Sequence, residues 1–125
     1  MGATGITKSD VKAFVEAAHG DLDRVRQLLA DRPLLLSMAN GNETALGAAC
    51  QMKRKDIIEF LLAQGAPMDI YAACVLGLTD QVAAFLDADP LLINSKKRQS
   101  HGKPLISFAS EQPETLALLT RRGAR

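Results

Sequence analysis

The sequence predicts an all-α fold built from four consecutive helix pairs. Three observations lead to this prediction: an internal repeat, apolar residues at helical spacing in four segments, and a short alanine-rich segment before each of those four. The chain has 125 residues, 47 % of them hydrophobic and 23 % charged, which suits one globular domain. A bundle of unrelated helices is the alternative, but it would not require a fixed period.

The repeat is visible when the sequence is shifted against itself. With a shift of 57 positions, residues 20–37 lie on residues 77–94, and seven of the 18 positions are identical without a gap. Pro33 and Pro90 form one identical pair, and Leu29 and Leu86 form another. A looser match with a shift of 58 places residues 60–66 on residues 118–124.

The period follows from the acidic residues that begin the four amphipathic segments. They are Asp23, Asp56, Asp80 and Glu114, with spacings of 33, 24 and 34 residues. Two spacings are close to 33 residues, whereas the middle one is about nine residues shorter.

Helical signals run through the chain in order. Val25, Leu28 and Leu29 recur at i, i+3 and i+4, and Pro113 suits the first turn of the last segment. Strand content should be close to nil. We expect helices at about residues 9–18, 22–31, 45–52, 56–64, 70–76, 79–87, 104–110 and 113–122.

Two short motifs resemble those of the ankyrin repeat. Residues 44–49 (TALGAA) and 103–109 (KPLISFA) are similar to its T-P-L-H-x-A motif, and residues 61–66 (LLAQGA) look like its closing segment. The resemblance covers about residues 9–125. It implies an ankyrin-type helical-repeat solenoid of four helix pairs in a single domain over residues 1–125. The implied repeats span about residues 9–40, 41–68, 69–94 and 95–125.

The sequence departs from the family pattern in two ways. Lys103 replaces the motif threonine, and Gly47 and Ile106 replace the motif histidine, so we expect less rigid repeats. The third repeat has no turn motif, which explains the short spacing. We therefore expect a tight turn at residues 65–71 without a projecting hairpin finger, and projecting links at residues 36–44 and 93–103.

No catalytic, metal or cofactor site is predicted. His19 and His101 lack the local motifs of hydrolases or metalloenzymes, and Glu16 and His19 supply a single E-x-x-H where a dimetal bundle needs two. Cys50 and Cys74 take the place of small apolar residues in two inner helices. We expect both thiols to be buried and reduced.

Positive charge gathers in two short runs, although the net charge is only +1. Lys53–Lys55 falls in a turn between helices, where solvated charges are ordinary. Lys96, Lys97 and Arg98 fall in the link before the fourth repeat, ahead of His101. Solvated charge is the ordinary interpretation of this second run as well. As a binding site it suits an acidic protein surface, and a nucleic acid is the alternative.

The resemblance also implies which residues line a concave face. Val75 and Leu76 are apolar where that face is expected to be polar, and Met52 is adjacent. These residues predict an apolar centre for partner binding, flanked by His19 and by Lys96, Lys97 and Arg98. The alternative is that Val75 and Leu76 pack inward.

The function implied by the resemblance is non-catalytic protein–protein interaction. The alternative is a binder of nucleic acid or a phosphorylated ligand through the basic loop 96–103. We expect a monomer with no cofactor and no membrane association. A cytoplasmic location is expected, because the sequence shows neither a secretory signal nor a long apolar stretch.

Overall fold

The computed structural model describes residues 5–94 and 103–125. Backbone contacts divide the chain into two compact units, Met1–Pro67 and Met68–Arg125. Each unit contains two helix pairs, and the predicted all-α class is confirmed.

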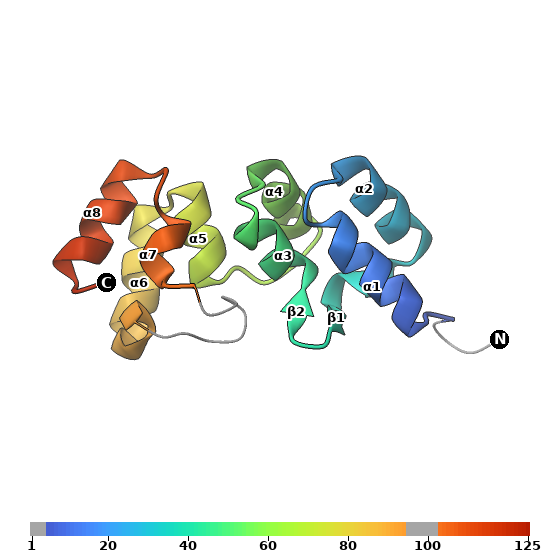
Figure 1. Cartoon of the computed structure of the whole chain (residues 1–125), viewed down its shortest axis with the longest axis horizontal. Helices are drawn as coiled ribbons and strands as arrows, with labels where there is room; N and C mark the ends of the chain where they lie inside the picture. The colour runs from blue at the N-terminus through green and yellow to red at the C-terminus, as the bar shows by residue number, and fades with distance from the viewer. Residues whose placement is uncertain (1–4, 95–102) are drawn as a thin grey trace. The chain divides into compact units, whose positions relative to one another are not determined.

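The first unit consists of two helix pairs and a hairpin (Figure 1). Its elements are α1 (Lys8–Ala17), α2 (Leu22–Asp31), the 3-10 helix η1 (Pro33–Ser37), β1 (Ala39–Asn40), β2 (Glu43–Thr44), α3 (Ala45–Gln51) and α4 (Lys55–Ala63). Helix α1 packs on α2 and α3, and α4 packs on α3 and α2. Phe14, Val25, Leu35, Ile58 and Leu61 are fully buried and form the core of this unit.

Side-chain caps explain where α1, α2 and α3 begin. Thr7 forms a capping box with Asp10, Asp21 accepts a hydrogen bond from the Arg24 N–H, and Thr44 accepts one from the Gly47 N–H. Each cap satisfies a backbone donor that the helix itself cannot, which is worth about 1 kcal/mol. The TALGAA motif thus begins α3 through its own threonine.

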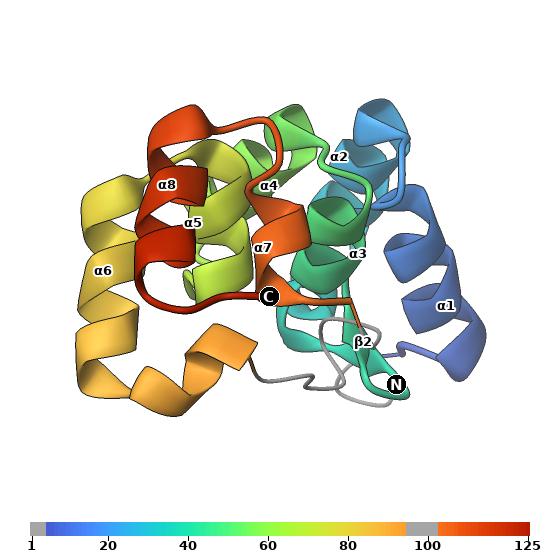
Figure 2. The same ribbon diagram turned by 60° about the vertical axis from the view of Figure 1, so that its left-hand side comes forward.

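The second unit repeats this plan without a hairpin among its described residues (Figure 2). Its elements are α5 (Ile70–Leu76), α6 (Thr79–Ala88), the 3-10 helix η2 (Pro90–Asn94), α7 (Leu105–Phe108) and α8 (Pro113–Arg121). Helix α5 packs on α6 and α7, and α6 packs on α8. The rings of Tyr71 and Phe108 lie 5.1 Å apart between α5 and α7. The Thr79 and Thr115 hydroxyls are 2.8 Å apart between α6 and α8.

Most helix bounds agree with the predicted ranges to within one residue, but α7 has four residues where seven were predicted. Its position for a capping threonine holds Lys103, so the helix begins after Pro104 with no side-chain cap. The Ala109 N–H then donates to the Ile106 carbonyl, which tightens the end of the helix into a 3-10 turn.

The links between helices follow the expected pattern where the structure describes them. The hairpin at residues 39–44 is the finger expected there, with Gly41 at φ 65° in its two-residue turn. Residues 65–69 contain no strand. The projecting link expected at residues 93–103 falls largely on residues 95–102, outside the described residues.

Candidate interaction surface

The finger of the first unit, residues 39–44, presents exposed backbone and side chains. Ala39 pairs with Thr44, and Asn40 pairs with Glu43, in a two-stranded ladder. Ala39, Asn40 and Gly41 are exposed, whereas Glu43 and Thr44 are half-buried. The tip of the finger is therefore available to a partner, while its base is anchored in the fold.

His19 ties the end of α1 to the base of the finger. Its Nδ1 lies 3.0 Å from the Val15 carbonyl, and a carbonyl only accepts, so Nδ1 carries the proton of this hydrogen bond. Its Nε2 lies 3.2 Å from Oε2 of Glu43. His19, a predicted binding residue, is half-buried and engaged in the structure of the first unit.

Met52 is the predicted binding residue that the structure exposes. It follows α3 as its C-cap and is 52 % exposed. A methionine side chain has three rotatable bonds and a polarizable sulfur, so it adapts to varied partner surfaces. Exposure of this side chain to water leaves apolar area that a partner could bury.

Val75 and Leu76 behave differently from Met52. Val75 is only 2 % exposed, so an exposed position for it is wrong and the inward-packing alternative holds. The reason is that α5 packs on both α6 and α7, which buries every residue from Ile70 to Val75. The Val75 carbonyl also accepts a hydrogen bond of 3.0 Å from Nε2 of Gln112. Leu76 is half-buried.

The predicted basic cluster lies outside the described residues. Lys96, Lys97, Arg98 and His101 all fall in residues 95–102. Lys103, the next basic residue, is exposed.

The described residues show no arrangement that would hold a metal ion. Within residues 5–94 and 103–125, no three His, Cys, Asp or Glu side chains are grouped suitably. Glu16, of the E-x-x-H sequence, instead lies 3.9 Å from Lys12 on the surface of α1. Cys50 and Cys74 are buried as predicted, and burial raises the pKa of the Cys74 thiol to about 12.

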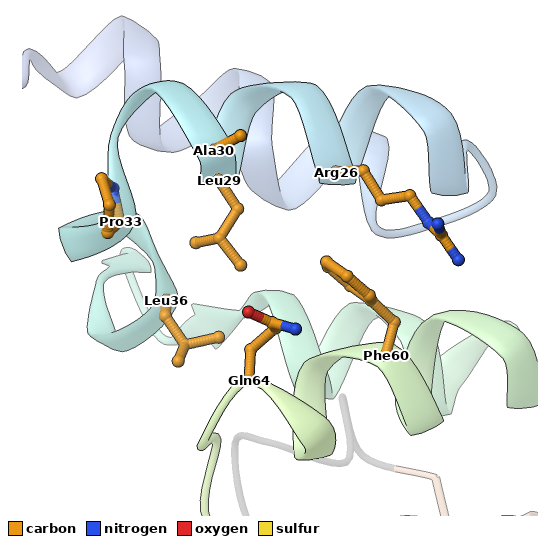
Figure 3. A pocket seen from close by; sticks show the side chains of 7 residues that line it. All are labelled: Arg26, Leu29, Ala30, Pro33, Leu36, Phe60 and Gln64. Atoms are coloured by element: carbon orange, nitrogen blue, oxygen red, sulfur yellow. The ribbon is translucent and has the colours of Figure 1, made fainter.

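A groove of about 440 Å³ lies in the first unit, and no sequence pattern indicated it. Figure 3 shows the groove between α2 and α4, with Leu29 and Phe60 projecting into it and Arg26 at one end. In the sequence, Leu29 stands out only through the repeated segment and through its helical spacing from Val25 and Leu28. The groove depends on the packing of α2 against α4, which no local pattern reveals.

Comparison with known families bears out the resemblance. Residues 41–73 match the family model of the ankyrin repeat, which covers the turn of the finger, α3, α4 and the beginning of α5. The chain therefore carries an ankyrin repeat, and ankyrin repeats are generally non-enzymatic modules for protein–protein interaction. A comparison with curated proteins found no match. No helix in the described part of the chain is long and apolar enough to cross a membrane.

Proposed function

We propose that this chain is a non-catalytic protein-interaction module that binds a partner protein through the finger and Met52. The observation that carries the proposal is the exposure of Met52 inside the segment that matches the ankyrin repeat. An exposed apolar side chain with polar surroundings is the usual centre of an interface. The exposed finger residues Ala39, Asn40 and Gly41 precede the same helix α3 that Met52 follows, and they supply the polar part of the proposed surface.

The proposal includes four ankyrin-type repeats in one domain, at about residues 9–40, 41–68, 69–94 and 95–125. The support is that α1/α2, α3/α4, α5/α6 and α7/α8 each form a contacting pair. The two buried cysteines form no disulfide in the described part of the chain, which accords with a reducing compartment, and we take this compartment to be the cytoplasm. We propose a monomer, and analytical ultracentrifugation measures this directly.

Photo-crosslinking from position 52 tests the proposal. A benzophenone amino acid replaces Met52 in one variant and Leu91 in a matched control, because Leu91 is also apolar and is 84 % exposed. Both variants are irradiated in a lysate of the source organism. We expect a discrete protein adduct from position 52 and none of that mass from position 91.

Two other outcomes would contradict the proposal. If positions 52 and 91 give protein adducts of the same masses, the adducts reflect non-specific contact with exposed apolar residues. A nuclease-sensitive adduct whose yield falls steeply with added salt would favour the alternative, a nucleic acid bound through the basic loop 96–103.

A further inference from the structure

The groove between α2 and α4 has an apolar floor and one cationic end. Leu29, Leu36 and Phe60 supply the floor, and Figure 3 shows all three side chains projecting between the two elements. At one end the Arg26 guanidinium carbon lies 5.2 Å from the centre of the Phe60 ring, in a cation–π contact. The Gln64 amide also lines the groove.

The second unit contains a corresponding groove, which is built from the second copy of the repeated segment. Its volume is about 240 Å³, and its lining includes Leu86, Pro90 and Ile93. A shift of 57 residues relates these three to Leu29, Pro33 and Leu36 of the first groove. The internal repeat therefore provides a natural comparison of two grooves with the same plan and different charges.

The second groove is crossed by an ion pair of its own. Arg122 donates a hydrogen bond of 3.0 Å from Nη1 to Oδ1 of Asp87, and both residues line the groove. The corresponding residues of the first groove are Ala30 and Gln64, which carry no charge. The smaller groove thus already has a carboxylate and a guanidinium paired with each other.

The first groove has a guanidinium without a carboxylate. Among the described residues no ion pair involves Arg26, whereas Arg32 and Arg54 each lie within 4.0 Å of an aspartate. Position 83, which corresponds to Arg26 in the second unit, is alanine. The Arg26 side chain is exposed, and its guanidinium lies over the Phe60 ring.

We propose that the first groove binds a segment of a partner protein in which a carboxylate stands next to an aliphatic or aromatic side chain. The carboxylate pairs with Arg26, the apolar side chain lies on Leu29 and Phe60, and Gln64 hydrogen-bonds the peptide backbone. A protein segment suits the groove because Arg26, Gln64 and Ala30 are exposed, so the groove is open along its length. The inference rests on the proposed role as an interaction module, but it uses a different surface.

Two short peptides probe the groove directly. Acetyl-GFLDG-amide carries the carboxylate, and acetyl-GFLNG-amide is its neutral counterpart of nearly equal shape. We expect the acidic peptide to bind at least fivefold more tightly in a titration followed by amide NMR. The shifted signals should include Ala30 and the Gln64 side chain.

A variant of Arg26 tests whether this residue causes the preference for the acidic peptide over the neutral one. Arg26→Gln should bind the two peptides equally, because it keeps a polar side chain but loses the charge. Arg24→Gln is the matched control, since Arg24 is an exposed arginine of the same helix that does not line the groove. It should keep the fivefold preference.

Transfer of the second groove's ion pair gives an independent test. The double variant Ala30→Asp, Gln64→Arg places an aspartate and an arginine where Asp87 and Arg122 stand in the other unit. We expect a folded protein with an unchanged melting temperature and at least tenfold weaker binding of the acidic peptide. If this variant or Arg26→Gln binds as the wild type does, or if neither peptide binds the wild type, the inference is overturned.

The outcome for Met52 separates this inference from the proposed function. Met52→Asp should leave peptide binding to the groove unchanged. If the benzophenone variant at position 52 gives no partner adduct while the acidic peptide still binds the groove, the proposed function alone is rejected. Intact crosslinking without peptide binding would reject the groove alone.

Discussion

Lys53 and Gly77 occupy the same left-handed backbone position, with φ of 53° and 74°, in the turns that follow α3 and α5. Their hydrogen bonds also correspond, because the Lys53 N–H donates to the Cys50 carbonyl and the Gly77 N–H donates to the Cys74 carbonyl. A left-handed conformation costs a residue with a Cβ atom roughly 1–2 kcal/mol, whereas glycine adopts it readily. The turn after α3 is therefore strained and the turn after α5 is not.

Lys53→Gly should relieve that strain. We expect the free energy of unfolding to rise by about 0.5–1 kcal/mol, because the greater entropy of glycine in the unfolded chain offsets part of the gain. Urea denaturation measures the change. Lys53→Ala is the control: it removes the side chain but keeps the strain, so it should not stabilise. Destabilisation by Lys53→Gly would contradict the account of this turn.

Gly77→Ala should have the opposite effect. A Cβ at position 77 would meet the Gln112 side chain, with Cδ only 2.8 Å away, and would also force alanine into the left-handed region. The displaced amide would lose its hydrogen bond to the Val75 carbonyl. We expect a loss of about 1–3 kcal/mol in the free energy of unfolding.

A double-mutant cycle separates the two causes. In a Gln112→Ala background the clash disappears and only the backbone strain remains, so Gly77→Ala should cost less there than in the wild type. Equal costs in both backgrounds would show that contact with Gln112 does not contribute.

Asp69 makes stability depend on pH. Its side chain caps α5 by accepting a 2.8 Å hydrogen bond from the Ala72 N–H, but burial raises its pKa above the ordinary value of 3.8. The folded state therefore favours the protonated acid. The stability contribution of this group is fully present below pH 3.8 and is lost as pH rises through the folded pKa.

Asp69→Asn should remove this dependence while keeping the cap, because asparagine caps helices as well as aspartate does. The variant should gain stability relative to the wild type as the pH rises above 3.8. Denaturation curves across the acidic range measure this difference. Asp69→Ala is the control, and it should be about 1 kcal/mol less stable than Asp69→Asn at every pH, because it lacks the cap and does not titrate. If the difference in the free energy of unfolding between Asp69→Asn and the wild type does not change with pH, the pH dependence does not come from Asp69.

The two thiols should react slowly in the native protein. Cys50 and Cys74 are buried, and burial together with the charge of Asp69 raises the pKa of Cys74 to about 12. Since the thiolate is the reactive form, neutral buried thiols resist a disulfide reagent at pH 8. Labelling should accelerate sharply in denaturant. Rapid labelling of either thiol without denaturant would contradict the burial described above.

The helices were predictable because their signals are local. The spacing of Val25, Leu28 and Leu29 marks a helix face regardless of what packs on it, and helix α2 lies at the predicted residues 22–31. The 3-10 helices η1 and η2 were missed because their apolar residues run consecutively and show no helical period. Residues 34–36 therefore show no helical spacing in the sequence, although Leu35 is fully buried in the structure.

The candidate site was less predictable because exposure depends on tertiary packing. Met52 follows α3 as its C-cap and is exposed, whereas Val75 lies within α5 and is buried where α5 packs on α6 and α7. The groove likewise joins Arg26 to Phe60, 34 positions apart in the sequence. No local pattern connects residues at that distance.

The affinity of the Met52 variant for the crosslinked partner tests the central claim most directly. The dissociation constant of that partner, purified, is measured by titration calorimetry for the wild type, Met52→Asp and the control Leu91→Asp. We expect Met52→Asp to weaken binding at least tenfold, because a partner surface would then bury an unpaired charge, and Leu91→Asp to change it less than twofold. Melting temperatures of both variants should match the wild type, since both side chains are exposed. Equal affinities for Met52→Asp and the wild type would contradict the claim that this surface binds the partner.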